Sequence, residues 1–390
     1  MKIGYDAKRA VFNNTGLGNY SRLVIEGIAS ENPEDSLLLY TPRFQSHPRT
    51  ACMEKLANVE FRLPPPQGFK GSMWRTFGIP NNLRADGVDI YHGLSNELPL
   101  NITSAGIPTV LTMHDVIYRK LPHDYTLADR MLDDFKYGRS CRAATHIIAV
   151  SECTRKDVAE AYGIDPDKIS VVYQGCAESF RKEFSPAEID ALRQRLNLPH
   201  RYILQVGTIE PRKNLELTVR ALASVPEGID LVAVGRDRLG YRRKVERIAE
   251  ETGVRNRIHF FEGLEGDAIP LLNRGAEIIA YPSRYEGFGI PVLEGITCGR
   301  PVVAATGSCL EEAGGGGAIY VSPDSPREMA NALNAIIHGE TDVESIIGRG
   351  KEHSQKFNIS DVASGVRSVY NKVVDKFFSD LGKKQVRNCK

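Results

Sequence analysis

The chain has 390 residues, of which 42% are hydrophobic and 25% charged, and its formal net charge is +1. This length suits two domains rather than one. The near-neutral charge argues against a nucleic-acid binder that depends on bulk electrostatics. The seven scattered cysteines contain no CxxC pair, which is typical of reduced thiols and excludes an all-paired disulfide scaffold or a zinc ribbon.

The N-terminus has no apolar signal core, and no stretch approaches the length of a membrane-spanning helix. We therefore expect a cytoplasmic protein. The last residues, 381–390, form a basic tail with Lys383, Lys384, Arg387 and Lys390. Such a tail is either a solvated chain end or a weak, peripheral contact with anionic lipids at the inner membrane surface.

Both halves of the chain alternate short apolar runs with longer amphipathic stretches, which predicts parallel sheets flanked by helices. In the first half, residues 1–178, the expected strands are 3–5, 37–40, 59–63, 90–91, 109–113, 147–150 and 169–173. The clearest helices there are 19–29, 127–143 and 154–162, and the Pro- and Gly-rich residues 64–71 read as a loop.

The second half, residues 179–358, opens with a helix start in which Ser185 is the N-cap and Glu188 lies three positions later. Its expected strands are 202–206, 231–234, 258–261, 278–281, 302–304 and 319–321. A second capping box, Ser325 with Glu328, begins a helix that runs to residue 337. A last helix within 359–380 follows no further strand and is free to pack elsewhere. The fold class is therefore α/β, with two Rossmann-like, doubly wound sheets facing a cleft, where ligands bind at the carboxyl ends of the strands.

Two glycines, Gly16 and Gly18, precede the first long helix. Backbone N–H groups at such a place can approach a phosphate, with help from the helix dipole. A tight turn that needs glycine explains the pair equally well. The third glycine of a dinucleotide fingerprint is missing, which disfavours a nucleotide-dependent oxidoreductase.

His114 and Asp115 follow the fifth strand of the first half. A histidine at the carboxyl end of a strand faces the expected cleft, where it can contact a sugar hydroxyl or a phosphoryl oxygen. The structural alternative is a histidine that is hydrogen-bonded to Asp115 and pins the loop.

In the second half, the first strand ends at Gly207 and Thr208, and Arg212 and Lys213 stand just before the next helix. Arginine offers a planar fork and lysine a point charge, and together they suit a pyrophosphate. An Arg-Lys pair is also common on protein surfaces, but its position after a strand favours a binding role.

The most informative segment joins Glu286 to Glu294. Glu286 lies in the loop before a helix that begins near Pro291, and Glu294 lies about one turn inside that helix. Between them, backbone N–H groups can face an anion, and two carboxylates can hold hydroxyl groups at opposite ends of one ligand. The residues of this backbone segment are Gly287, Phe288, Gly289 and Ile290.

In these motifs and their order, the chain resembles the retaining, GT-B-fold glycosyltransferases of family 4 over nearly its whole length. The resemblance implies that Gly16 and Gly18 line the donor phosphates and that His114 contacts the transferred sugar. It implies that Arg212 and Lys213 neutralise the diphosphate. It also implies that Glu286 faces the hydroxyls of the sugar and that Glu294 faces those of the ribose. The backbone around Phe288 and Gly289 would hold the sugar. The last helix would cross back onto the N-terminal domain. The remaining donor-site residues are Gly207, Thr208, Gly287 and Ile290.

There are departures from the family pattern. Many relatives carry an arginine where this chain has Thr208, and Arg212 would supply that charge; a glycine run replaces the usual residues at 314–317. The acceptor is expected to contact His92, Asn96 and Glu97, although a plain loop explains that segment equally well.

The implied activity is transfer of a sugar, with GDP-mannose as the favoured donor, to a glycan or lipid-linked acceptor in bacterial surface polysaccharide or lipopolysaccharide synthesis. Cationic side chains and helix N-termini would stabilise the departing diphosphate, so we expect no metal and no cofactor; the nucleotide sugar is itself a substrate. A UDP-sugar donor stays open. A sugar-nucleotide 2-epimerase and a non-catalytic nucleotide-sugar-binding subunit are the competing classes, and the sequence does not indicate the oligomeric state.

Overall fold

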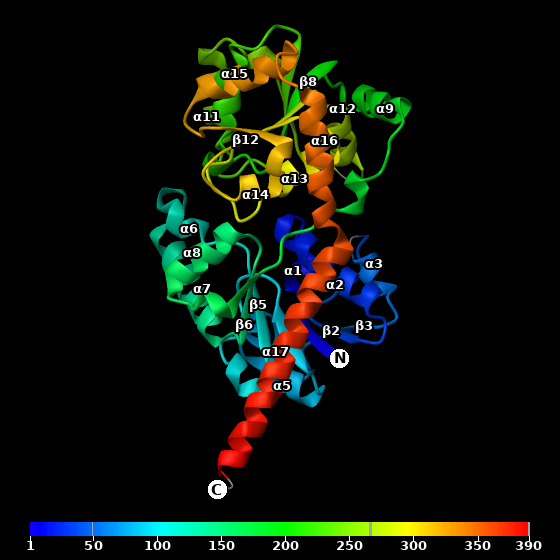
Figure 1. Cartoon of the computed structure of the whole chain (residues 1–390), viewed down its shortest axis with the longest axis vertical. Helices are drawn as coiled ribbons and strands as arrows, with labels where there is room; N and C mark the ends of the chain where they lie inside the picture. The colour runs from blue at the N-terminus through cyan, green and yellow to red at the C-terminus, as the bar shows by residue number, and fades with distance from the viewer. Residues whose placement is uncertain (49, 265–266, 389–390) are drawn as a thin grey trace. The chain divides into compact units, whose positions relative to one another are not determined.

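The computed structural model describes residues 1–48, 50–264 and 267–388, with side chains up to residue 380 (Figure 1). The chain forms two compact units. The first unit comprises Met1–Arg119, Tyr125–Gly175 and the chain from Ile359 onward, and the second comprises Lys120–Asp124 and Cys176–Asn358. None of the helices in the described residues is long and apolar enough to cross a membrane.

The first unit is built on a seven-stranded parallel sheet in the order β3-β2-β1-β4-β5-β6-β7. Strands β4, β5 and β6 are buried along their whole length, as expected when helices cover both faces of a parallel sheet. The strands are β1 (Lys2–Asp6), β2 (Ser36–Tyr40), β3 (Val59–Arg62), β4 (Ile90–Gly93), β5 (Thr109–Met113), β6 (His146–Ala149) and β7 (Ile169–Val171).

The α-helices of the first unit include two whose N-terminal caps explain where they begin. The hydroxyl of Thr126 accepts a hydrogen bond from the Asp129 amide, and Ser151 caps Thr154 in the same way. The helices are α1 (Lys8–Phe12), α2 (Gly16–Glu31), α3 (Ala51–Glu54), α4 (Gly71–Met73), α5 (Ile79–Ala85), α6 (Ile117–Lys120), α7 (Leu127–Ala143), α8 (Glu152–Tyr162) and α17 (Ile359–Asn388).

The C-terminal helix α17 runs beside α2 within the first unit, as Figure 1 shows. The two helices approach closely at Gly27, where an added Cβ would lie 3.0 Å from side-chain atoms of Ala363 and Ile359. The helix is also tied to the sheet by Tyr370, whose hydroxyl lies 2.6 Å from Nδ1 of His92. The residues of the basic tail lie beyond the described side chains.

The second unit has a six-stranded parallel sheet in the order β10-β9-β8-β11-β12-β13. Its strands are β8 (Arg201–Val206), β9 (Ile229–Val234), β10 (Ile258–Phe261), β11 (Ile278–Tyr281), β12 (Val302–Ala305) and β13 (Ala318–Val321). Its helices are α9 (Pro186–Leu196), α10 (Leu215–Leu222), α11 (Arg242–Glu251), α12 (Ala268–Gly275), α13 (Ile290–Thr297), α14 (Leu310–Gly314), α15 (Pro326–Ile337) and α16 (Val343–Ser354).

The two predicted capping boxes have different outcomes. At α9 the reciprocal pair of Ser185 and Glu188 is complete. At α15 the side chain of Ser325 caps the Glu328 amide, but the Glu328 carboxylate accepts from the amide of Ser322 instead of completing the box. Each unit is a doubly wound α/β layer structure, which confirms the predicted fold class.

The strand orders place one topological switch point in each sheet. In the first unit the order reverses between β1 and β4, and in the second between β8 and β11. At such a point the connections leave the sheet in opposite directions, so the carboxyl ends of the two strands open a crevice for a ligand. In the second unit, several charged side chains meet there.

Candidate functional site

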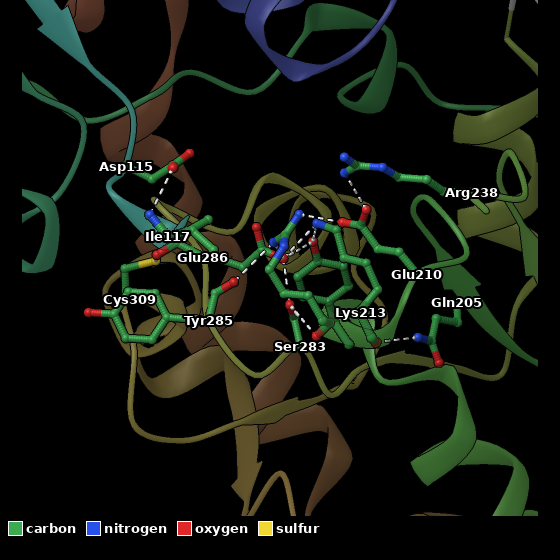
Figure 2. A network of polar contacts seen from close by, with 12 residues as sticks. Asp115, Ile117, Gln205, Glu210, Lys213, Arg238, Ser283, Tyr285, Glu286 and Cys309 are labelled. Carbon is green, nitrogen blue, oxygen red and sulfur yellow. Dashed lines mark hydrogen bonds and ion pairs between the residues drawn. The ribbon is translucent and has the colours of Figure 1, made fainter. Parts of the chain in front are cut away.

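The switch point of the second unit carries an ion-pair cluster. Arg212 and Lys213 belong to a short turn of 3₁₀ helix, η6 (Pro211–Lys213), which follows β8, and Glu286 lies in the loop that follows β11. The Lys213 ammonium lies 2.6 Å from Oε1 of Glu286, and the Arg212 guanidinium 2.7 Å from the same oxygen. Figure 2 shows Lys213 and Glu286 pointing toward one another. The structure thus brings these three predicted site residues together.

The Glu286 carboxylate is held almost entirely through one of its oxygens. Besides the two cations, Oε1 accepts hydrogen bonds from the hydroxyls of Ser283 at 2.5 Å and Tyr281 at 3.0 Å. In the described part of the chain, no hydrogen bond from the protein reaches Oε2. That oxygen is therefore available to accept hydrogen bonds from a ligand, while Oε1 is committed to the protein.

The protonation state of Glu286 follows from this arrangement. Burial raises the pKa of the carboxyl, but Arg212 and Lys213 outweigh burial and lower it to about 2. Burial lowers the pKa of Lys213, and Glu286 opposes that shift. At neutral pH the site therefore holds an ionised carboxylate, which accepts hydrogen bonds but is a poor proton donor.

Arg212 joins this cluster to a second carboxylate. Its guanidinium donates to Oε1 of Glu210 at 2.7 Å and to the Tyr285 carbonyl at 3.0 Å. The other carboxylate oxygen of Glu210 accepts from Arg238 at 3.0 Å. The side chain of Glu210 is only 9% exposed, whereas that of Arg238 is 55% exposed.

Hydrogen bonds from side-chain amides to backbone carbonyls fix the two loops that carry these groups. Asn214, in the left-handed conformation at φ 57°, donates from its amide to the carbonyls of Pro282 and Pro323. Gln205 donates to the Lys213 carbonyl at 2.9 Å and is itself held by Thr218. The loop after β8 is thus joined to the loop after β11 by side-chain amides, which pre-positions Lys213 beside Glu286.

The segment between Glu286 and α13 is shaped by close packing. Gly289, at φ 115°, is the N-cap of α13, and an added Cβ would lie 2.6 Å from Leu310. Phe288 is buried, with its ring centroid 5.6 Å from that of Phe357. The Phe288 side chain therefore supports the loop from inside, and only its backbone is suited to ligand binding. Gly287 is buried as well, and Ile290 begins the helix half-buried.

Glu294 lies on α13, in a different electrostatic environment from Glu286. No cation or hydrogen-bond donor contacts its carboxylate among the described residues, and burial raises its pKa to about 8. At neutral pH this side chain is therefore mainly a protonated carboxyl, which can both donate hydrogen bonds to hydroxyl groups and accept them. At Gly207, with φ 152°, an added Cβ would lie 3.7 Å from the aliphatic part of Lys213, and Thr208 follows it half-buried.

In the first unit, His114 follows β5 and is buried. Its Nε2 lies 2.9 Å from the Leu94 carbonyl, and its Nδ1 lies 3.2 Å from the amide nitrogen of Gln174. Because a carbonyl only accepts, Nε2 carries the proton and Nδ1 accepts from Gln174. The ring is held by these two groups rather than by Asp115, which caps the Ile117 amide. Burial lowers the pKa of His114 to about 4, so the ring is neutral at physiological pH.

The two glycines of the first unit begin α2 and differ in their surroundings. Gly18 packs so tightly that an added Cβ would lie 1.9 Å from the Asn13 carbonyl oxygen, and its amide donates to the Thr15 carbonyl. Gly16 has open space around it. Gly18 thus has a packing role, and the helix α1 lies between β1 and these glycines, which the sequence did not predict.

The three residues expected to contact an acceptor lie in different settings. His92 is fully buried between Tyr370 and Thr112, which contact its two ring nitrogens at 2.6 and 2.8 Å. The placement of its ring inside the unit does not favour direct contact with an acceptor. Asn96 accepts from the His114 amide at 2.7 Å. Glu97 is partly exposed and pairs with Arg75 at 2.8 Å, beside the switch point of this sheet.

Sequence reasoning missed several residues of the second-unit cluster. From the sequence alone, no role is assigned to Glu210, Tyr281, Ser283 or Arg238. The signal for the first three was their position directly beside Arg212 or Glu286 in the sequence. Nothing in the residues around Arg238 distinguishes it from a surface loop. Among the described residues, no group of three or more His, Cys, Asp or Glu side chains has the arrangement of a metal site.

Comparison with known proteins gives the family. Residues 188–353 match the family model for glycosyl transferases group 1, and residues 19–179 match that for glycosyltransferase family 4. O-antigen chain mannosyltransferase B of Escherichia coli is 27% identical over 288 residues, which cover 72% of this chain and 74% of that protein. Serotype-specific mannosyltransferase WbdA of Escherichia coli is 24% identical over 286 residues, 71% of this chain but only 35% of WbdA.

Solved structures agree on the fold. HepE of Anabaena, determined in complex with UDP and glucose, superimposes with a TM-score of 0.74 at 22% identity, covering 95% of this chain and all of that chain. WaaG, a glycosyltransferase involved in lipopolysaccharide biosynthesis, has a TM-score of 0.70 at 19% identity, covering 96% of this chain and 99% of its own. With family models matching both units and GT-B neighbours along its length, the chain belongs to the GT-B-fold glycosyltransferases.

Proposed function

We propose that the protein transfers mannose from GDP-mannose to a glycan or lipid-linked acceptor during synthesis of a bacterial surface polysaccharide, with retention of the anomeric configuration. The observation that carries the proposal is the Glu286 carboxylate, pinned through Oε1 by Lys213 and Arg212 at the switch point. The choice of mannose is supported by the mannosyltransferases among the relatives. The role in polysaccharide synthesis is supported by the O-antigen enzymes in the same group.

The charges of the cluster suit departure of a nucleoside diphosphate. As the bond from the anomeric carbon to the diphosphate breaks, the electron pair leaves with the phosphate oxygen, where negative charge grows. Lys213 and Arg212 are already oriented by Glu286 and Glu210, so they stabilise this charge without reorganisation. Two fixed cations can do this without a bound metal, and we propose a metal-independent enzyme.

Glu286 as a carboxylate and Glu294 as a protonated carboxyl would hold the donor through its hydroxyl groups. In this proposal the uncommitted Oε2 of Glu286 accepts from the transferred sugar, and Glu294 accepts from the ribose. Glu286 is not assigned as the nucleophile, because four donors hold its Oε1 and its Oε2 holds the sugar hydroxyl in this proposal. The acceptor hydroxyl attacks instead, on the face from which the diphosphate leaves, and its proton passes to an oxygen of the departing diphosphate.

The proposed roles of residues in the first unit rest on the resemblance to the family. His114 is proposed to contact the transferred sugar as a neutral ring, and Gly16 to approach the donor phosphates. Asn96 and Glu97 are proposed to contact the acceptor, with Glu97 supported by its partial exposure. A nucleotide-sugar 2-epimerase is not favoured, since family models for glycosyl transfer match both units.

A UDP-sugar is the second candidate donor, favoured by the complex of HepE with UDP-glucose. The test is a donor panel in which release of GDP and UDP is measured from GDP-mannose, UDP-glucose and UDP-N-acetylglucosamine, with and without EDTA. We expect GDP release from GDP-mannose, undiminished by EDTA. Turnover of UDP-sugars alone would overturn the proposal for mannose, and loss of turnover with EDTA would overturn metal independence.

Peripheral membrane contact is part of the proposal. Helix α7 exposes four large apolar side chains at positions that form one face, and Arg139 and Arg142 are exposed toward its C-terminal end. An amphipathic helix with apolar and basic groups together suits an anionic lipid surface. The apolar residues are Leu127, Met131, Leu132 and Phe135. Co-sedimentation with vesicles of phosphatidylglycerol, lost in Met131→Glu, tests this contact; equal binding by that variant would contradict it.

A further inference from the structure

A row of charged side chains at the switch point of the second unit extends beyond Arg212. Five charged side chains follow one another through hydrogen-bonded contacts: Lys213, Glu286, Arg212, Glu210 and Arg238. Three are cations and two are carboxylates, so the row has one positive charge in excess. Figure 2 shows Arg238 directed at Glu210, at the far end of the row from Glu286.

The row spans three neighbouring strands. Arg238 follows β9, Arg212 follows β8, and Glu286 follows β11, and these strands are adjacent in the sheet. The carboxyl ends of parallel strands lie at one edge of a sheet. Arg238 therefore stands on the same edge as the proposed diphosphate site, one strand farther from Glu286 than Arg212 is.

The backbone under Arg238 is fixed although its side chain is exposed. The Ile209 amide donates to the Arg236 carbonyl at 2.9 Å, and the Arg238 amide donates to the Ile209 carbonyl at 3.1 Å. The loop after β9 is thereby joined to the loop after β8. This ladder orients Arg238 before any ligand arrives, which lowers the entropic cost of binding.

The guanidinium of Arg238 retains most of its donors. In the described part of the chain its one hydrogen-bond acceptor is Glu210, and the side chain is 55% exposed. Glu210 already has a partner in the nearly buried Arg212, so it does not need Arg238 for neutralisation. An exposed ion pair of this kind adds little to stability. The pair instead places an oriented, solvent-accessible guanidinium beside Arg212.

We propose that Arg238 is a third cationic contact for the diphosphate of the donor, and that Glu210 is the positioning residue that holds Arg212 and Arg238 side by side. This inference rests on the proposed function. A guanidinium presents parallel N–H groups that match phosphate oxygens. Arg238 thus adds a guanidinium contact on the β9 side of Arg212, which favours a diphosphate over a monophosphate because the diphosphate has more oxygens to contact.

The test is calorimetric binding of pyrophosphate, GDP, UDP, GMP and UMP to the full chain and to Arg238→Ala, with Arg236→Ala as the matched control. Arg236 lies on the same loop and is exposed, but among the described residues the ion-pair partners of Glu210 are Arg212 and Arg238. We expect Arg238→Ala to weaken binding of pyrophosphate and of the preferred nucleoside diphosphate by about 10-fold. Binding of monophosphates should change less than twofold, and Arg236→Ala should behave as the wild type.

The outcomes separate the inference from the proposed function. Equal affinities for the two variants would overturn the role of Arg238 while leaving the proposed function intact. Failure of the wild type to bind GDP, UDP and pyrophosphate would overturn both. The role of Glu210 is tested by a double-mutant cycle for pyrophosphate affinity. Glu210→Gln and Arg238→Ala should be non-additive, whereas Glu210→Gln and Arg236→Ala should be additive. Additivity in both cycles would overturn the positioning role.

Discussion

The ammonium of Lys213 lies 2.6 Å from Oε1 of Glu286, although the two residues are 73 positions apart in the chain. This pair joins the loop after β8 to the loop after β11, so it connects the two strands between which the sheet reverses its order. The Tyr281 hydroxyl lies within hydrogen-bond distance of both groups. The same contacts that orient Lys213 also leave the second oxygen of Glu286 uncommitted, and the proposed chemistry depends on both consequences.

The first prediction concerns Lys213→Ala. Removing a fixed cation from beside a departing diphosphate should lower kcat with the donor by roughly 100-fold or more. The fold should survive, because Arg212 still pairs with Glu286. Steady-state kinetics and circular dichroism check the two parts. Lys244→Ala, which removes a lysine paired with Glu216 on the surface, is the control and should leave kcat unchanged. Near-normal turnover by Lys213→Ala would mean that the diphosphate binds elsewhere.

A second prediction follows from the lowered pKa of Glu286. A carboxyl with a pKa of about 2 in the folded protein, against 4.5 as the ordinary value, stabilises the fold above pH 4.5. That contribution, about 3 kcal/mol, is lost as the pH falls toward 2. Urea unfolding at about pH 6, 4.5 and 3.5 should therefore show a weaker pH dependence in Glu286→Gln than in the wild type.

The control for that measurement is Glu251→Gln, at the exposed end of α11. It should reproduce the pH dependence of the wild type. If Glu286→Gln did so as well, the carboxylate would not be held ionised by Lys213 and Arg212. The description of the site as a pre-oriented ion-pair cluster would then be wrong.

The sequence predicted the sheets well because buried parallel strands read as short apolar runs. All thirteen expected strands have a counterpart in the two sheets, often within one residue at each end. The region 71–85 was not predicted, because Gly78 and Pro80 interrupt the periodicity and a π-helical turn, Trp74–Gly78, separates α4 from α5. The short α1 was missed for a related reason, since five residues are too few to show a helical period.

The site was predictable only in part. Arg212, Lys213 and Glu286 were singled out because each follows a strand, and parallel strands end at one edge of a sheet. The use of a single oxygen of Glu286 by four donors depends on side-chain positions that no motif encodes. The burial of His92 could not be predicted either, because its partner Tyr370 lies 278 positions later in the chain.

A third prediction concerns Glu294, whose pKa is raised to about 8 by burial. For an acid with a raised pKa, the contribution to stability is fully present below the ordinary value of 4.5 and is lost as the pH rises through 8. Glu294→Gln removes this dependence. The thermal stability of the variant relative to the wild type should therefore be greater at pH 8 than at pH 5, while its affinity for the nucleotide falls. Parallel pH profiles for the two proteins would contradict the unpaired state of Glu294.

The last prediction uses two buried tyrosines of the first unit as a matched pair. The Tyr370 hydroxyl contacts Nδ1 of His92 at 2.6 Å and the Tyr5 hydroxyl at 3.2 Å. The Tyr91 hydroxyl is also buried, yet it has no hydrogen-bond partner among the residues described. Tyr370→Phe should lower the free energy of unfolding by about 1–3 kcal/mol, because it leaves His92 unsatisfied in the interior. Tyr91→Phe should be neutral or stabilising, since it removes a buried polar atom that makes no bond. Urea unfolding of both variants is the measurement: equal losses would show that the hydrogen bond between Tyr370 and His92 contributes nothing to the packing of α17 on the sheet.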